Sequence, residues 1–202
     1  PELRSSRIYN PVDVATERTE TRGVDIQKPI VMSAGRLAKV KDFPTLLDAF
    51  ARLPFSDARL IILGEGQERS RIEKYAVQLG ISDRLHLPGH IHDMTSYFKL
   101  ADVFVVSSLS ESFSNVLVEA LSHGLPVIAT DCGGPREILD HGRYGQLVKC
   151  GDAAAMAAAI ERAIRQGESG AEKRSERADY FNLAASVQQY HKLFDLVIAR
   201  TQ

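Results

Sequence analysis

The sequence alternates six times between a short apolar run and a segment that suits a helix, and this alternation limits the folds open to the chain. The runs are PIVMSAG (29–35), ARLIILG (58–64), RLHLPG (84–89), DVFVVSS (102–108), PVIAT (126–130) and GQLVK (145–149). Val, Ile and Leu fill them without polar alternation, as in strands that are buried on both faces. The pattern predicts an α/β fold with a Rossmann-like, doubly wound, parallel six-stranded sheet.

The segments between the runs predict the helices that cover this sheet. Helices are expected over 45–53, 68–79, 94–100, 115–123 and 135–139, and Asp152 should cap another that ends near Gln166. Residues 167–182 fit a loop or a short helix, and 183–199 fit an amphipathic helix. Because 1–28 are polar and aperiodic, we predict a linker there, a Rossmann-like domain over 29–166 and a helical segment over 167–202.

Composition argues against several classes of protein. Lys and Arg number 25 against 26 Asp and Glu, and such a balance argues against general nucleic-acid binding, which uses clustered positive charge. Cys132 and Cys150 share no CxxC spacing and are expected to be free thiols in a reducing compartment. No apolar run reaches the ~18 residues of a membrane span, and the first residues do not resemble a signal peptide, so we expect a cytoplasmic protein.

A stretch that contains two glutamates is the strongest candidate for a ligand site. Glu111 follows the fourth apolar run, where a parallel sheet binds ligands beyond the carboxyl ends of its strands. Glu119 lies in the helical run VLVEALS, where a carboxylate is costly to bury unless something hydrogen-bonds it. A ribose diol could supply those hydrogen bonds. The alternative is that neither glutamate binds a ligand: Glu119 would lie on the solvent-exposed face of an amphipathic helix, and Glu111 would be a surface residue of a loop.

The start of the predicted helix at 115–123 suits a phosphate group. If Ser114 or Asn115 begins this helix, the amides of Asn115, Val116 and Leu117 should be free at its positive end. A nucleotide diphosphate that carries a polar group would then explain the helix start and both glutamates together.

Two cations follow the first apolar run in GRLAKVKD. Arg36 could bind a diphosphate through two hydrogen bonds, and Lys41 could attract the same group as a point charge. Taken alone, the pair more often marks two ordinary surface charges. Their place at a strand end, shared with Glu111, favours an anion site.

Three weaker motifs are better explained by structure than by chemistry. LGEGQE (63–68) lacks the third glycine of a dinucleotide loop and fits a tight turn, although its glycines could let a ligand approach the backbone. His90 and His92 in GHIHD lack a third ligand at a recognisable spacing, so no metal site is predicted. The serines of SSLSES stand in no GxSxG motif, which argues against covalent serine catalysis.

The motifs GRLAKVKD, LGEG, ESFSNVLVEA and GLPVIATDCGGPREIL, in this order, resemble the C-terminal half of family-4 (group 1) retaining glycosyltransferases. These enzymes have the GT-B fold, two Rossmann-like halves around a cleft, and use nucleotide-diphosphate sugars. The resemblance covers about Ile8 to Ile164. It implies that this chain is one half of a GT-B fold.

The resemblance also implies roles for individual residues. Arg36 and Lys41 match the pair that neutralises the donor diphosphate, Glu111 matches the glutamate on the donor sugar, and Glu119 matches the ribose-binding glutamate. The implied catalytic residues are Arg36, Lys41 and Glu111. The implied substrate-binding residues are Gly35, Gly64, His90, Ile91, Ser114, Asn115, Val116, Leu117 and Glu119, with His90 and Ile91 near the nucleobase.

Several expectations about the whole enzyme follow from the resemblance. The family often has Gly-Phe-Gly after the first glutamate, and the Ser-Phe-Ser-Asn found here favours a UDP-linked donor for a hexosyl- or N-acetylhexosaminyltransferase. The chemistry should be independent of metal and of other cofactors. IYNPVD (8–13) matches the interdomain linker, so an N-terminal acceptor domain is expected to be missing and the fragment to be inactive alone.

The expected pathway is polysaccharide, lipopolysaccharide or glycolipid biosynthesis. The acceptor could be lipid-linked, and the parent enzyme could act peripherally at the inner face of the membrane through its other half. Two alternatives stay open: half of another GT-B enzyme such as a sugar-nucleotide epimerase, or a nucleotide-binding or interaction module without catalysis.

Overall fold

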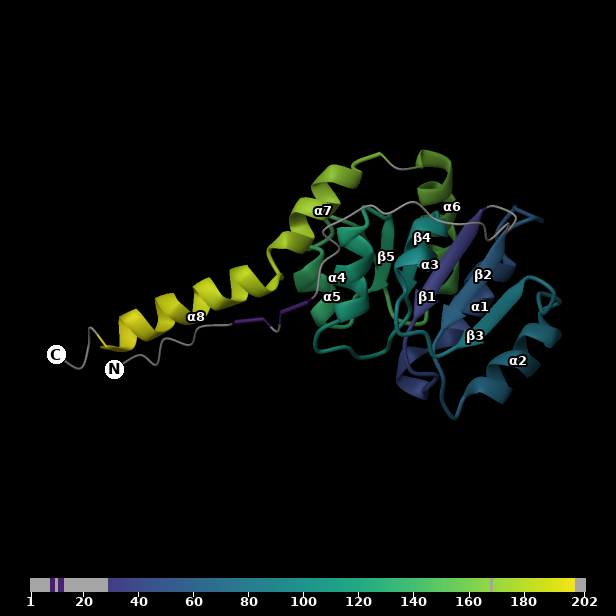
Figure 1. The fold of residues 1–202 in the computed structure, drawn as a ribbon. Coiled ribbons are helices and arrows are strands. Elements are labelled where there is room, and N and C mark those ends of the chain that lie inside the picture. The colour runs from purple at the N-terminus through teal and green to yellow at the C-terminus, as the bar shows by residue number, and fades with distance from the viewer. Residues whose placement is uncertain (1–7, 10, 13–28, 168, 199–202) are drawn as a thin grey trace.

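Six parallel strands form the centre of the protein in the order β3-β2-β1-β4-β5-β6 (Figure 1). The computed structural model describes residues 8–9, 11–12, 29–167 and 169–198. The strands are β1 (Ile30–Ala34), β2 (Arg59–Leu63), β3 (Leu85–Gly89), β4 (Val103–Val106), β5 (Val127–Thr130) and β6 (Gln146–Val148). Each lies within one of the six predicted runs, so the predicted parallel α/β sheet is confirmed.

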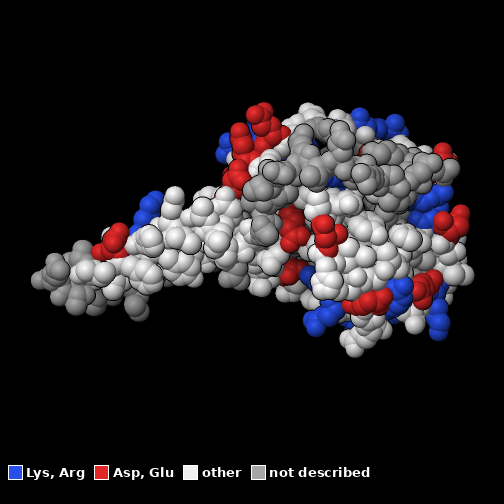
Figure 2. Space-filling model, viewed as in Figure 1, with Lys and Arg blue, Asp and Glu red and all other residues white. Residues whose placement is uncertain are grey.

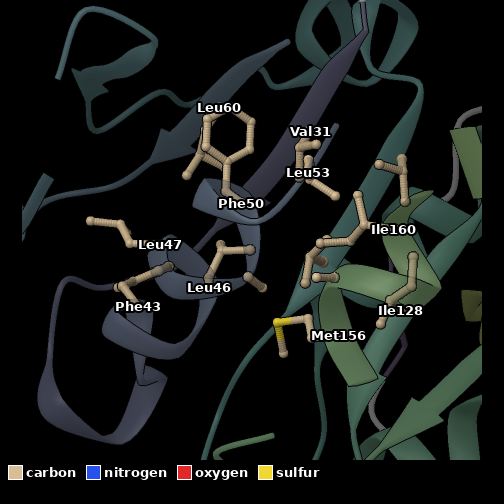
Figure 3. Close-up of a cluster of buried hydrophobic side chains, with 14 of the residues drawn as sticks. Val31, Phe43, Leu46, Leu47, Phe50, Leu53, Leu60, Ile128, Met156 and Ile160 are labelled. Atoms are coloured by element: carbon tan, nitrogen blue, oxygen red, sulfur yellow. The ribbon is translucent and has the colours of Figure 1, made fainter. Parts of the chain in front are cut away.

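Alternate residues of the strands feed two separate hydrophobic cores, except in β3, where Leu85 and Leu87 pack on one core and His86 between them is exposed. Val31, Leu60 and Ile128 face a core with Leu46 and Phe50 of α1 and Met156 and Ile160 of α6, part of which is shown in Figure 3. The neighbouring strand residues, among them Met32, Ile61 and Phe104, face the other core under α4. Both faces of the sheet are therefore covered at the other five strands, which is why those strand sequences show no polar alternation.

The helices follow the predicted segments closely. They are α1 (Phe43–Ala51), α2 (Arg69–Gln78), α3 (Thr95–Leu100), α4 (Asn115–Ser122), α5 (Gly134–Ile138), α6 (Ala153–Gln166), α7 (Ala171–Asp179) and α8 (Leu183–Ile198). The Asp152 side chain accepts the N–H of Ala155 and caps α6 as predicted. A short 3-10 helix, η1 (Lys39–Lys41), was not predicted, and α7 decides the open alternative for 167–182 in favour of a helix.

The last helix projects away from the body of the protein (Figure 1). In Figure 2 it forms a mostly uncharged arm. Its large exposed apolar residues are Leu183, Val187, Tyr190, Phe194, Leu196, Val197 and Ile198, and among its described residues only Ser186 is buried. The predicted amphipathic helix is confirmed. None of the described helices has the length and apolar character that crossing a membrane requires.

Most of the predicted linker over 1–28 falls outside the described residues. Two residues that the structure does describe pack on the body: Val12 is 5% exposed, and Tyr9 lies partly buried against the core under α4. The N–H of Val12 donates to the carbonyl of Phe181 at 2.9 Å.

The order of the strands identifies where a ligand should bind. Going outward from β1, the chain runs through β2 and β3 on one side, and through β4, β5 and β6 on the other. In open parallel sheets, ligands bind beyond the carboxyl ends of the strands at such a reversal point. The loops that follow β1 and β4 are therefore the first place to look for a site.

Candidate functional site

The loops after β1 and β4 bring Lys41 and Glu111 together at this reversal point. The Lys41 ammonium pairs with the Oε2 of Glu111, and the two side chains are 21% and 15% exposed. The Ser108 hydroxyl donates to the same oxygen at 3.2 Å. Two residues predicted to act on one ligand are thus in direct contact, which the sequence could not show.

The backbone after β1 fixes the position of Lys41. Its carbonyl accepts a hydrogen bond from the Ser107 hydroxyl at 2.7 Å, which ties η1 to the end of β4. Its side chain crosses Gly35, where an added Cβ would lie 3.3 Å from the Lys41 Cε. Arg36 is exposed and makes no side-chain hydrogen bond or ion pair with any other described residue. The two cations therefore differ: Lys41 is engaged, whereas Arg36 can reach an anion from solvent.

A Gly-Gly pair after β5 holds the backbone of Glu111. The N–H of Gly134 donates to the Glu111 carbonyl at 2.7 Å, and Gly133 forms an isolated bridge with Glu111. A Cβ on Gly134 would lie only 2.6 Å from the Ser112 carbonyl oxygen, so the loop can approach only a glycine. These glycines entered the sequence analysis only within the motif GLPVIATDCGGPREIL. A Gly-Gly pair two residues after a buried strand was the available signal.

The helix α4 begins at Asn115, with Ser114 as its N-cap. The Ser114 side chain makes no capping bond, and its buried hydroxyl has no partner among the described residues. It lines a small cavity together with Lys41, Ser108 and Val116. Its hydroxyl therefore faces the same space as the predicted phosphate-binding cation.

One of the three predicted amides is already in use. The N–H of Leu117 donates to the Ser114 carbonyl at 3.1 Å, so it is not free as the sequence led us to expect. Within the described part of the chain, the N–H groups of Asn115 and Val116 find no backbone acceptor. The positive end of α4 thus offers two amides to a ligand rather than three.

Glu119 is half-buried, neither sealed in the core nor fully in solvent. Leu117, Val118, Ala120 and Leu121 take the buried positions around it. One turn earlier on its face of α4 stands Val116, which lines the small cavity. The carboxylate therefore lies on a partly exposed face next to the candidate site, where a polar ligand could reach it.

The remaining predicted residues lie at the ends of β2 and β3. The N–H of Gly64 donates to the Gly89 carbonyl at 2.7 Å, and a Cβ on Gly64 would lie 2.0 Å from the Gly35 carbonyl oxygen. This close approach explains LGEGQE as a tight packed turn. His90 is exposed directly after β3, and Ile91 is half-buried. The loops after β1, β2 and β3 thus adjoin, although among the described residues His90 and Ile91 make no hydrogen bond to Lys41 or Glu111.

Comparisons with known proteins identify the family of this chain. A sequence profile of the family "Glycosyl transferases group 1" matches residues 16–180. The chain belongs to this glycosyltransferase family. It is 40% identical over 136 residues to the lipopolysaccharide core biosynthesis glycosyltransferase LpsE of Rhizobium meliloti. The matched region covers 67% of this chain and 39% of LpsE.

Solved structures place the fold among GT-B glycosyltransferases. Sucrose-phosphate synthase from Thermosynechococcus elongatus superposes with a TM-score of 0.78 at 31% identity, over 88% of this chain and 47% of that one. HepE of Anabaena, solved in complex with UDP and glucose, gives 0.76 at 26% identity over 82% and 48%. The chain spans about half the length of its relatives, as expected for one half of a GT-B fold.

Three titratable groups of this glycosyltransferase chain lie near the Glu111 loop: Cys132, Cys150 and Asp131. Burial raises the pKa of the Cys132 thiol, whereas Cys150 is exposed and its Sγ lies 3.7 Å from the Ser108 carbonyl oxygen. A hydrogen bond from Arg136 lowers the pKa of Asp131, with Nε to Oδ1 at 2.7 Å. Both cysteines are free thiols, as predicted.

Two further features lie apart from the Lys41–Glu111 pair. The rings of His90 and His92 meet edge-on at 4.7 Å, and among the described residues no group of three or more His, Cys, Asp or Glu could hold a metal ion. A surface hollow of about 480 Å³ is lined by Pro126, Gly145, Lys173 and others. Because Pro126 and Gly145 precede β5 and β6, it lies at the amino ends of the strands, opposite the candidate site.

Proposed function

We propose that this chain is the donor-binding half of a retaining glycosyltransferase that uses a nucleotide-diphosphate sugar. The observation that carries the proposal is the meeting of Lys41, Glu111 and the start of α4 at the reversal point of the sheet. A cation, a carboxylate and free helix amides match the diphosphate, the sugar hydroxyls and a phosphate oxygen of one ligand.

Each residue has a distinct task in this proposal. Arg36 and Lys41 hold the diphosphate, and the amides of Asn115 and Val116 add positive potential to it. Glu111 accepts hydrogen bonds from the donor sugar. The basic pair and the helix end stabilise the negative charge that develops as the diphosphate leaves, without a metal ion. Loss of one such contact typically raises a barrier by about 2–4 kcal/mol.

The other end of the donor would lie along α4 and the β2–β3 edge. Glu119, half-buried on the open face of α4, accepts hydrogen bonds from the ribose diol. Gly35 and Gly64 let the nucleotide come close to the backbone, and His90 and Ile91 border the base. HepE, which was solved with UDP-glucose at 26% identity, supports a UDP-linked donor.

The acceptor would be bound by a second half outside this chain. The similarity to LpsE supports a role in lipopolysaccharide or related polysaccharide biosynthesis, with a hexosyl or N-acetylhexosaminyl group transferred at the cytoplasmic face of a membrane. Because the reaction needs both halves, the chain alone should bind the donor but transfer little sugar.

Calorimetric titration with UDP, GDP and ADP in EDTA tests the proposal. We expect UDP to bind most tightly and Mn²⁺ to add little. Glu119→Ala should weaken binding of UDP, whereas Glu161→Ala, on the remote helix α6, should bind like the parent. If none of the three nucleotides binds at millimolar concentration, the donor-binding proposal is wrong. A strong metal requirement would instead refute the metal-independent mechanism.

A further inference from the structure

We infer that Tyr9 is a positioning residue for the loop that carries Glu111, an inference that rests on the proposed function. The Tyr9 ring stacks on Phe113 with ring centroids 5.6 Å apart and planes inclined by 29°. Phe113 lies between Glu111 and Ser114, the N-cap of α4. A residue far away in the sequence therefore touches the segment proposed to bind both sugar and phosphate.

The third ring of this cluster makes the contact rigid. Phe181 meets Tyr9 edge-on at 5.3 Å and Phe113 at 5.6 Å, so the three rings contact one another pairwise. Phe181 itself is fully buried. Phe113 is half-buried and packs against the core under α4, and the two rings beside it help to hold its position.

The Tyr9 hydroxyl reaches the second support of Glu111. It donates to the Oε2 of Glu137 at 3.0 Å. Glu137 belongs to α5, whose first residue, Gly134, donates its N–H to the Glu111 carbonyl. Tyr9 thus makes two contacts near Glu111. Its ring contacts Phe113 in the loop, and its hydroxyl contacts α5, the helix that holds the Glu111 backbone.

Tyr9 is in turn held by the end of the chain. The Ser186 hydroxyl of α8 donates to the Tyr9 carbonyl at 3.2 Å, and the Val12 N–H donates to the carbonyl of Phe181. Tyr9, Val12 and the start of α8 are therefore anchored together beside the loop that carries Glu111. A displacement of any of them would loosen the loop without any change in the residues that touch the donor.

The test compares the parent with Tyr9→Leu, Tyr9→Phe, Phe113→Leu and the Tyr9→Leu/Phe113→Leu double variant. Tyr190→Leu is the matched control, since Tyr190 pairs with Phe194 at 6.3 Å on α8, away from the site. Calorimetry gives the affinities for UDP and for UDP-glucose. Hydrogen exchange of the peptide over 111–117 reports the loop without any ligand.

Tyr9→Leu should reduce the preference for UDP-glucose over UDP by about three- to tenfold, the range expected for one aromatic contact. It should also speed exchange over 111–117. Tyr9→Phe, which keeps the stacking and loses only the hydroxyl, should show a smaller change, and the double variant should change little more than Phe113→Leu alone. Tyr190→Leu should match the parent.

Two outcomes would overturn the inference: a parental preference for UDP-glucose over UDP in Tyr9→Leu, whether or not both affinities fall equally, or unchanged exchange over 111–117. If Tyr9→Leu does not fold, Tyr9→Phe and Phe113→Leu decide by the same readings. A parent that binds no nucleotide would refute the proposed function, and the exchange measurement would still decide whether Tyr9 holds the loop.

Discussion

Lys41 and Glu111 are 70 positions apart in the sequence, and their side chains pair across the point where the strand order reverses. Lys41 follows β1 and Glu111 follows β4, its neighbour in the sheet. Each residue is the counter-ion of the other in this structure. A donor that binds through both must therefore compete with their mutual attraction.

Glu111→Gln should tighten the binding of UDP while it removes the preference for UDP-glucose. The substitution releases Lys41 for the diphosphate and removes a negative charge beside it. We expect UDP affinity to rise about two- to fivefold, the effect of one modest ion pair. Calorimetry at low and at high salt measures this, and the gain should shrink as salt rises.

Glu161→Gln is the matched control for this charge change, since Glu161 pairs with Arg165 on α6 at 2.8 Å and is remote from the site. It should leave UDP affinity unchanged. If Glu111→Gln weakens UDP as much as Lys41→Ala does, Glu111 supports nucleotide binding directly and the competition does not exist.

Gly64→Ala should destabilise the protein far more than Gly80→Ala. Both glycines have positive φ, at +136° and +68°, but a Cβ on Gly64 would meet the Gly35 carbonyl oxygen at 2.0 Å, whereas nothing lies within 4 Å at Gly80. We expect a loss of about 3 kcal/mol or more at Gly64 and of about 1 kcal/mol at Gly80. Urea unfolding measures both, and equal losses would show that backbone strain alone matters at Gly64.

The architecture could be predicted because its signals are local. A strand that is covered on both faces must be apolar throughout, so runs such as 102–108 were visible without any partner. A polar residue before an apolar helical run placed the start of α4 at Ser114 or Asn115, and the structure has Ser114 as its N-cap. The two ends of each element shifted by only a few residues, as where Phe43 rather than Thr45 begins α1.

The contacts of the site could not be predicted because they depend on strand order. Lys41 meets Glu111 only because β1 and β4 are neighbours, and no pattern within either loop encodes that. The resemblance implied that both residues bind the same ligand, but it did not imply that their side chains pair with each other. Likewise, Tyr9 belongs to a segment that was interpreted from the sequence as a linker, and its ring stacks on Phe113 in the loop that carries Glu111.

Asp131→Asn should reduce stability at neutral pH and make no difference in strong acid. The hydrogen bond from Arg136 lowers the Asp131 pKa from its ordinary value of 3.8. A lowered folded-state pKa contributes stability that is complete above the unfolded value and is lost as pH falls through the folded value. Urea unfolding from pH 7 to pH 2 should therefore show a constant gap between parent and variant above about pH 5 that closes below about pH 4.

Arg136→Gln should lose the same pH-dependent part of the stability, and the double variant should lose no more than either single one. A gap between parent and Asp131→Asn that persists at pH 2 would mean that the charge of Asp131 is not what stabilises this turn.

Iodoacetamide should modify Cys150 before Cys132, although both thiols lie near the Glu111 loop. The reactive form is the thiolate, and burial raises the pKa of Cys132 and shields it, while Cys150 is exposed. We expect at least about a tenfold difference in rate at pH 8, followed by mass spectrometry of the intact protein. In Cys150→Ser only the slow modification should remain. In roughly 8 M urea, which unfolds the protein, the rates of the two cysteines should converge. Faster modification of Cys132 would mean that the loop opens often enough to expose it, which the Gly134 contact with Glu111 argues against.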